Sequence, residues 1–110
     1  MQISWDDFQN IEIRVGTIIK VEPFLEARTP AYKVWVDFGE LGVKKSSAQI
    51  TKLYSQKELV GKQVICVINF KPKQIANFVS EILITGFVSE NDEVILVQPE
   101  RKVRNGLRLA

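Results

Sequence analysis

The sequence predicts an all-β protein, a small five-stranded Greek-key barrel with short helices, and three observations lead to this prediction. Residues 11–22 alternate between apolar and polar side chains, which is the period of a strand with one buried face. Residues 63–87 contain two apolar runs, VICVINF and EILITGF, joined by a basic connection through Lys71, Pro72 and Lys73. A short helical segment lies between the third and fourth expected strands.

The first expected element is a short helix that opens at Ser4. Ser4 and Asp7 have the spacing of a capping box, with Asp in place of Glu, and Trp5 and Phe8 share one face of the helix. A helix of this length is not stable alone. Its two aromatic side chains must therefore pack against the barrel or against a partner chain.

Residues 11–21 follow as a long, half-buried antiparallel strand. Strict alternation places Ile19 on the apolar face and Ile18 on the polar face. Gly16, in the middle, predicts a bend or bulge of the kind that lets one long strand serve both halves of a barrel. Pro23 ends the strand.

A second strand runs from Tyr32 to Phe38, with Val34 and Val36 on the apolar face and Trp35 on the polar face. An outward-facing Trp has two interpretations, and both remain open. It belongs to a surface for binding or association, or a loop covers its ring. The turn GELG then leads into a third strand, residues 43–50.

Ser55 and Glu58 form a second capping-box pattern, with Gly61 as the stop of a short helix. In the fourth strand, VICVINF, nearly every position is apolar, so it should be covered on both faces. The run EILITGF gives the fifth strand, and residues 92–99 give an extra C-terminal strand. This order favours a barrel of the oligonucleotide/oligosaccharide-binding (OB) type over other small barrels.

The composition limits the functional classes. The chain has 110 residues, a net charge of +2, one Cys and no His. We therefore expect a single domain over residues 1–110, with no disulfide, metal site or His-dependent chemistry. The sequence shows neither a signal peptide nor an apolar run of membrane-spanning length, which predicts a cytoplasmic protein without membrane insertion.

Several motifs, in order, resemble those of one family. They are DFxxIEIRVGTI, EARTPAYKVWVDFG, KSSAQIT, VINFKPKQIANFVSEIL and a C-terminal VRNG, and they extend over residues 7–106. Together they resemble the CsaA family of bacterial export-related chaperones. That family is similar in turn to the tRNA-binding domains appended to some methionyl- and phenylalanyl-tRNA synthetases.

The resemblance implies a homodimer of OB-fold barrels that binds unfolded or precursor polypeptides without an ATP cycle, with an export motor as a further partner. The apolar pattern agrees with a dimer, because an aromatic helix and a doubly apolar strand are surplus surface for one small barrel. The residues expected at this dimer interface are Trp5, Phe8, Ile65 and Val67.

The expected peptide site centres on the shared motif around the turn after the fourth strand. Its residues are Trp35, Asn69, Phe70, Lys71, Lys73, Phe78, Ser80 and Glu81. In this reading Asn69 hydrogen-bonds the client backbone, the two lysines attract anionic groups, and Trp35 and Phe78 take apolar side chains. The alternative to peptide binding is a purely structural role, in which the segment is a solvated turn and Asn69 and Ser80 only hold strands in register.

The alternative function is binding of tRNA or another structured RNA. Its candidate residues are Lys44, Lys45, Lys52, Lys71 and Lys73, which would contact phosphates. The synthetase-type domains usually carry Ser followed three residues later by Met, whereas here Leu83 follows Ser80 and Glu81 adds a carboxylate. A carboxylate facing phosphate opposes binding, so this departure favours the chaperone reading.

The remaining features are interpreted as structural. The C-terminal cluster of Arg101, Lys102, Arg104 and Arg108 is read as a solvated edge protected by charge rather than as a binding patch. Cys66 is expected to be a buried, inert thiol. No catalytic motif is present, and we expect neither enzymatic activity nor a cofactor.

Overall fold

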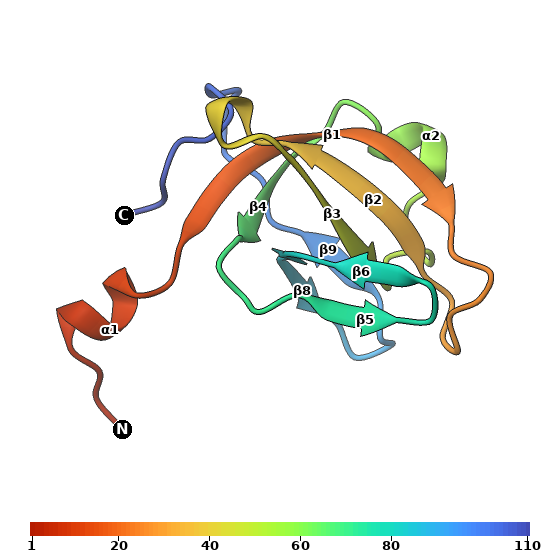
Figure 1. Ribbon diagram of the computed structural model, residues 1–110, viewed down its shortest axis with the longest axis horizontal. Helices are drawn as coiled ribbons and strands as arrows, with labels where there is room; N and C mark the ends of the chain where they lie inside the picture. Colours follow the sequence, from red (N-terminus) through yellow and green to blue (C-terminus); the bar gives the residue numbers. More distant parts are fainter.

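The long strand β1 is the element around which the barrel is built (Figure 1). The computed structural model describes all residues from Met1 to Ala110. Its elements are α1 (Trp5–Gln9), β1 (Ile13–Pro23), β2 (Tyr32–Asp37), the 3-10 turn η1 (Gly39–Leu41), β3 (Val43–Ala48), α2 (Gln56–Leu59), β4 (Gln63–Val67), β5 (Lys73–Ile75), β6 (Phe78–Ser80), β7 (Leu83–Ile84), β8 (Gly86–Val88) and β9 (Val94–Leu96).

Five antiparallel strands form one sheet in the order β3-β2-β1-β4-β7, which curls into a nearly closed barrel. The second half of β1 pairs with β2, and its first half pairs with β4, so one strand serves both halves. The expected OB-type barrel is confirmed. Both capping boxes are also confirmed, at Ser4 with Asp7 and at Ser55 with Glu58.

The bulge in β1 lies further along the strand than the sequence indicated. The register against β2 shifts between Ile18 and Lys20, which leaves Ile19 as the extra residue. Ile18 is consequently fully buried and Ile19 is exposed, so the expected faces of these two residues were wrong. Gly16 has a different role, because a Cβ there would lie 2.6 Å from Cγ1 of Val36.

The barrel interior is filled from β1, β2, β4 and α2. Val34, Val36 and Phe38 alternate inward along and just beyond β2, and all three are fully buried, as their spacing predicted. Leu59 is the buried residue of α2 and joins the same core cluster. The short helix therefore covers one end of the barrel, and its capping box fixes where it begins.

Strand β4 is buried on both faces within a single chain. Val64 and Cys66 point into the barrel and are fully buried. Ile65, on the opposite face, is 8% exposed, and it borders an apolar hollow together with Val103 and Leu107 of the C-terminal segment. That segment follows β1, with main-chain bonds such as Val15 N–H to Leu107 O. The sequence predicted that both faces of this strand are buried, and the C-terminal segment of the same chain buries the face that carries Ile65.

The connection between β4 and β7 is not a simple basic turn. It contains a hairpin, β5 and β6, closed by the two-residue turn Ala76–Asn77. The fifth barrel strand, β7, begins only after this hairpin, and β8 and β9 form a second small antiparallel pair. Neither helix combines the length and the apolar composition that a membrane-spanning helix needs.

Cys66 lies inside the barrel wall, where burial raises the pKa of its thiol to about 12. The thiol is therefore protonated at neutral pH, and a protonated, enclosed sulfur is a poor nucleophile. Its placement among core residues confirms the buried thiol expected from the apolar run.

Candidate ligand-binding groove

Two connections face each other on one side of the barrel and enclose a groove. They are the β1–β2 loop, residues 24–31, and the β5–β6 hairpin. The loop–hairpin groove has a volume of about 650 Å³ and is lined by residues 26–29, Ala31, Ser47, Gln49 and residues 73–76. These connections correspond to the loops after the first and fourth barrel strands, between which OB folds bind their ligands.

Three aromatic rings form a small core of their own beneath the hairpin. Phe78, at the start of β6, lies 5.4 Å from the Phe24 ring and 5.9 Å from the Trp35 ring, both in edge-to-face geometry. Phe24 and Phe78 are buried, and Trp35 is half-buried. Trp35 therefore faces away from the barrel interior, as its position predicted, and the hairpin covers it.

Lysine side chains lie over these rings. Nζ of Lys20 is 4.6 Å from the Trp35 ring centre, and Nζ of Lys45 is 5.2 Å from that of Phe78. Lys33 lies 5.0 Å from the Phe24 ring and also pairs with Glu26 of the β1–β2 loop. The ammonium groups thus lie over the aromatic faces at cation–π distance, so this surface is cationic over an aromatic base.

Ser80 and Glu81 join the hairpin to the barrel. Oγ of Ser80 accepts the main-chain N–H of Ser47 at 3.0 Å, and Oε1 of Glu81 accepts that of Lys45 at 3.1 Å. The main-chain N–H of Glu81 donates to Lys45 O at 2.8 Å. Side chains thus satisfy part of the edge of β3, which explains how the barrel closes there without a continuous strand pair.

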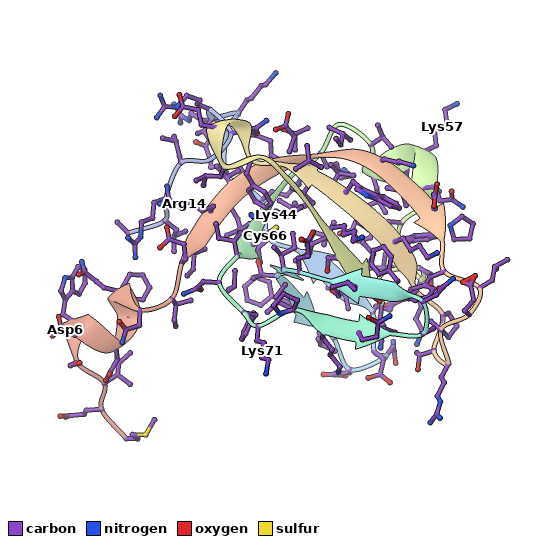
Figure 2. All side chains as sticks on the ribbon, viewed as in Figure 1. Asp6, Arg14, Lys44, Lys57, Cys66 and Lys71 are labelled. Atoms are coloured by element: carbon purple, nitrogen blue, oxygen red, sulfur yellow. The ribbon has the colours of Figure 1, made fainter.

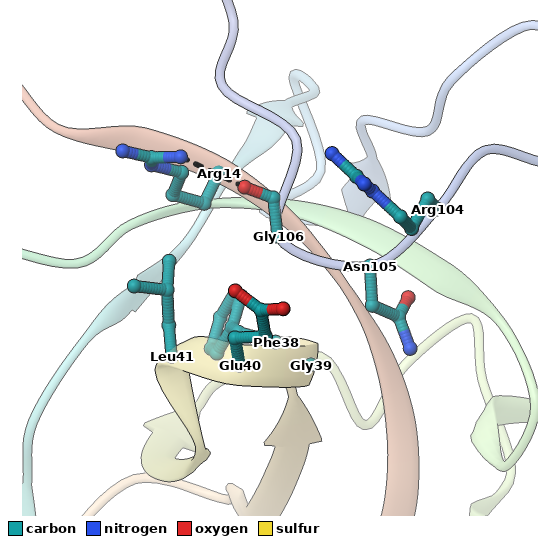
Figure 3. A pocket seen from close by; sticks show the side chains of 8 residues that line it. All are labelled: Arg14, Phe38, Gly39, Glu40, Leu41, Arg104, Asn105 and Gly106. Atoms are coloured by element: carbon teal, nitrogen blue, oxygen red, sulfur yellow. Dashed lines mark hydrogen bonds between the residues drawn. The ribbon is translucent and has the colours of Figure 1, made fainter.

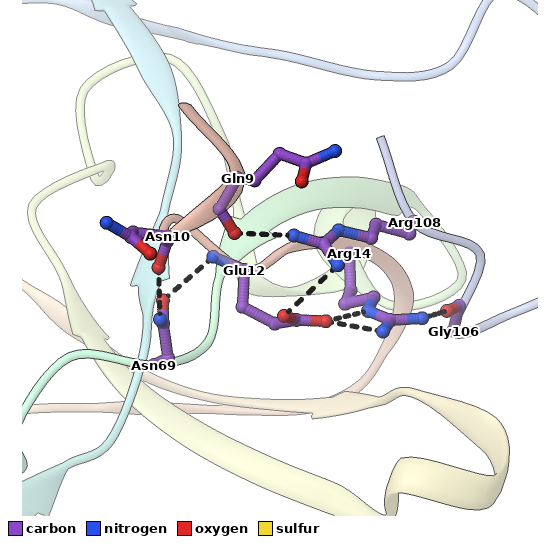
Figure 4. Close-up of polar contacts among 7 residues, drawn as sticks. All are labelled: Gln9, Asn10, Glu12, Arg14, Asn69, Gly106 and Arg108. Carbon is purple, nitrogen blue, oxygen red and sulfur yellow. Dashed lines mark hydrogen bonds and ion pairs between the residues drawn. The ribbon is translucent and has the colours of Figure 1, made fainter. Parts of the chain in front are cut away.

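Asn69 lies at the base of α1 rather than in the groove (Figure 4). Its Oδ1 accepts the N–H of Glu12 at 2.9 Å, and its Nδ2 donates to the carbonyl of Asn10 at 2.7 Å. The main-chain N–H of Ile68 also donates to Glu12 O. The amide of Asn69 therefore holds the α1–β1 joint to the end of β4.

The other expected peptide-site residues are dispersed. Phe70 and Lys71 are exposed in the β4–β5 connection, and Lys71 projects away from the barrel in Figure 2. Lys73 is exposed on β5 and lines the loop–hairpin groove. The structure therefore gathers Trp35, Phe78, Ser80 and Glu81 under or beside the hairpin, and it places Lys73 on the groove wall.

The lysines proposed for RNA binding have different surroundings. Lys45 lies over Phe78, and Nζ of Lys52 donates to the carbonyl of Asn91 in the β8–β9 turn at 3.0 Å. Lys44 is half-buried on β3, whereas Lys71 and Lys73 are exposed and form no ion pair. Three of the five, Lys44, Lys71 and Lys73, thus have no side-chain contact that a phosphate would have to break, and the last two are exposed.

A second hollow, of about 430 Å³, lies between η1 and the C-terminal segment (Figure 3). Arg14 borders it, but its guanidinium is already engaged by Glu12 and by the carbonyl of Gly106 at 2.9 Å. Glu12 also pairs with Arg108 at 3.7 Å. Arg14 is thus used to hold the C-terminal segment to β1, whereas Arg104, which also borders this hollow, is exposed and forms no ion pair.

Comparisons with known proteins decide the family. Residues 13–108 match the family model described as "Putative tRNA binding domain".

This chain belongs to that tRNA-binding domain family.

Two similar solved structures are described as CsaA chaperones, which confirms the resemblance inferred from the motifs. The CsaA chaperone of Bacillus anthracis is 44% identical with a TM-score of 0.95, and the match covers 100% of both chains. That of Picrophilus torridus is 47% identical with a TM-score of 0.93, covering 99% of this chain and 100% of the other.

The family also includes much longer proteins. The methionine–tRNA ligase of Methanococcoides burtonii is 31% identical over 104 residues, which is 94% of this chain and 15% of that enzyme. The chain spans about 15% of the length of the curated relatives that it matches. The region shared with those ligases is therefore the barrel domain.

The β5–β6 hairpin, which forms one wall of the loop–hairpin groove, was not predicted from the sequence. A signal was present, because KQI and FVS are short strand-forming runs around Ala76–Asn77, a two-residue turn. Ala76 has a φ of +51°, a conformation that usually indicates Gly, so the turn was not recognised. The roles of Gln49 and Arg28 in the groove depend on the tertiary fold and had no local signal.

Proposed function

We propose that this protein is an ATP-independent chaperone that binds unfolded or precursor polypeptides in the loop–hairpin groove. The observation that carries the proposal is the match to two CsaA chaperones along the whole of both chains, with identities of 44% and 47%. The groove supports it. Its lining mixes Ala27, Ala31, Ile75 and Ala76 with polar groups, which suits a client without a fixed side-chain pattern.

The finer proposal is that the clients are precursors held for export in the cytoplasm and passed to an export motor. This rests on the CsaA likeness alone. No catalytic step is part of the proposal, and no cofactor is required.

We also propose that the chaperone acts as a homodimer. The helix α1 stands apart from the barrel in Figure 1 and buries none of its own residues. Trp5 is 66% exposed and contacts Phe8 in a tilted arrangement, with ring centres 5.7 Å apart. Half-buried Val67 pairs with exposed Leu83 in the barrel sheet, and exposed Phe87 pairs with exposed Ile95 in the separate β8–β9 sheet.

These exposed groups favour a symmetric interface in which α1 of each copy covers apolar surface of the other. Of the four interface residues predicted from the sequence, Trp5, Phe8 and Val67 remain available for it. Ile65 is covered within the chain and contributes little. Sedimentation at micromolar concentration tests the dimer, and Trp5→Ser with Phe8→Ser should release monomers.

Client binding is tested by titrating an unfolded precursor peptide against two variants. Each variant carries one introduced Trp side chain, and the two differ only in its position. Thr29→Trp places an indole in the groove from the β1–β2 loop, and Gln56→Trp places the same group on exposed α2. We expect the first variant to lose most peptide affinity and the second to retain it. Equal peptide affinity of the two variants would show that the groove is not the client site. If the unmodified protein does not bind the peptide, the chaperone hypothesis is wrong.

Binding of tRNA is the second candidate, and the family match favours it. Exposed, unpaired Lys71 and Lys73 are its best-placed phosphate contacts. A tRNA titration at low and high salt separates the two functions, because phosphate contacts release counterions and weaken steeply with salt, whereas apolar client binding barely changes. Lys71→Ala and Lys73→Ala should reduce the salt slope, and Lys57→Ala on α2 is the matched control (Figure 2).

A further inference from the structure

Strand β5 uses only one of its two edges. It pairs with β6 through Lys73 with Ser80, Gln74 with Val79 and Ile75 with Phe78, and with no other strand. Ile75 and Phe78 flank the two-residue turn, so they are a hydrogen-bonded pair, and the next pair, which includes Gln74, is not. The main-chain N–H and C=O of Gln74 therefore point away from β6.

This free edge faces the loop–hairpin groove. All three residues of β5 and the adjoining Ala76 line the groove, whereas no residue of β6 does. Successive side chains of a strand point to opposite faces, so a groove bordered by all three residues lies along the edge of the strand. The β1–β2 loop closes the other side.

The neighbouring wall also offers main-chain groups. Gln49 follows the last residue of β3, is exposed and lines the groove. Its main-chain N–H and C=O take part in no hydrogen bond of the structure. The groove thus presents unpaired main-chain donors and acceptors on two walls, and these are the complement of another main chain in extended conformation.

We propose that an extended segment of the client binds in this groove as a third strand on β5. The inference rests on the proposed chaperone function and specifies how that site recognises its client, through main-chain hydrogen bonds. Strand addition obtains affinity from groups that every sequence possesses. Three strand residues span about 10 Å, so the segment that pairs directly is about three to five residues long.

The charged residues around the free edge of β5 determine which client segments bind favourably in the groove. Arg28 and Lys73 line the groove and have no ion-pair partner, whereas Glu26 is paired with Lys33. An acidic residue or a carboxylate beside the paired segment is therefore favoured. Pro72 and Lys73 protect the start of the edge, as Pro and Lys do at natural sheet edges, which opposes pairing with a second copy of β5.

Alternating N-methylation of a peptide tests strand addition without altering the protein. In an antiparallel pair only every second residue directs its N–H to the neighbouring strand. Two isomers of one neutral seven-residue peptide are therefore compared, methylated on the odd or on the even amides. We expect one isomer to lose at least about tenfold in affinity and the other to stay within about twofold of the unmodified peptide.

A second readout is amide hydrogen exchange on the protein. Peptide binding should slow exchange of the Gln74 N–H, whereas Ile75 is already bonded to β6 and should change little. Gln74→Pro removes this donor at an edge position where Pro is tolerated, and Gln74→Ala keeps it. The Pro variant should lose affinity by about tenfold and the Ala variant should bind like the parent protein.

The outcomes separate this inference from the function on which it rests. If both methylated isomers bind like the parent peptide and Gln74 exchange is unchanged, strand addition is overturned while client binding stands. If the unmodified peptide does not bind, the chaperone function fails and the inference fails with it. Loss confined to one isomer, with protection of Gln74, supports both.

Discussion

Substitution of Asn69 distinguishes the role read from the sequence from the role shown by the structure. The shared motif suggested that this amide binds the client backbone, yet both of its polar atoms are engaged at the base of α1, with Glu12 N–H and Asn10 O. Asn69→Ala removes both bonds. Asn69→Asp retains the acceptor for Glu12 N–H and removes only the donor to Asn10 O.

The magnitude follows from the exposure of the groups. Each bond contributes about 0.5–1.5 kcal/mol net, and the two main-chain groups can be rehydrated because they lie at an exposed joint. Asn69→Ala should therefore weaken the α1–β1 joint by about 1–2 kcal/mol, and Asn69→Asp by about half as much. Ile68 N–H to Glu12 O and Arg108 to Gln9 O remain, so α1 loosens without unfolding.

Three measurements check the result. Hydrogen exchange of the Glu12 amide should accelerate in the order wild type, Asp variant, Ala variant. If α1 forms the proposed dimer interface, the dimer dissociation constant should rise about five- to thirtyfold in the Ala variant, since 1.4 kcal/mol corresponds to tenfold. Peptide affinity per groove should be unchanged. A tenfold loss of peptide affinity with normal Glu12 exchange would refute this placement of Asn69.

Four further substitutions test the fold. Ala76→Gly should stabilise the hairpin by about 0.5–1 kcal/mol, read from exchange of its amides, because φ at this position is +51°. Ile18→Ala should cost about 2–5 kcal/mol in denaturant unfolding and Ile19→Ala below about 0.5, since the bulge buries only the first. The raised pKa of Cys66 means that the unfolded chain loses its thiol proton first as pH rises. Stability should therefore fall from about pH 9 towards the folded value of about 12, and Cys66→Ala should lack this decline.

Local patterns were sufficient for the parts of the fold that local chemistry determines. The capping boxes at Ser4 and Ser55 place both helices because side-chain caps act within three residues. Val34 and Val36 face inward because strand alternation is geometric. The barrel type followed from the order of these elements along the chain, although the run expected as the fifth strand is divided between β7 and β8.

The failures arise where tertiary packing overrides a local pattern. The register shift after Ile18 depends on pairing with β2, which no window around Ile18 contains. Ala76 adopts a conformation typical of Gly because the docked hairpin around it imposes the turn. Cover for Ile65 by the C-terminal segment joins residues about forty positions apart, and the sequence assigned that face to a second copy instead.

In the candidate site, the role of Glu81 is likewise set by a tertiary contact that the local sequence does not show. The sequence argument against RNA assumed that its carboxylate faces phosphate, but the structure directs it to the N–H of Lys45, across the seam between the hairpin and β3. A carboxylate held in this way closes the barrel, and its effect on a phosphate beside Lys71 or Lys73 is reduced by that bond and by solvent screening. Glu81 therefore gives no basis for choosing between the two functions. The choice depends on what the groove and the two exposed lysines contact, and only the salt response and the methylated peptides measure those contacts separately.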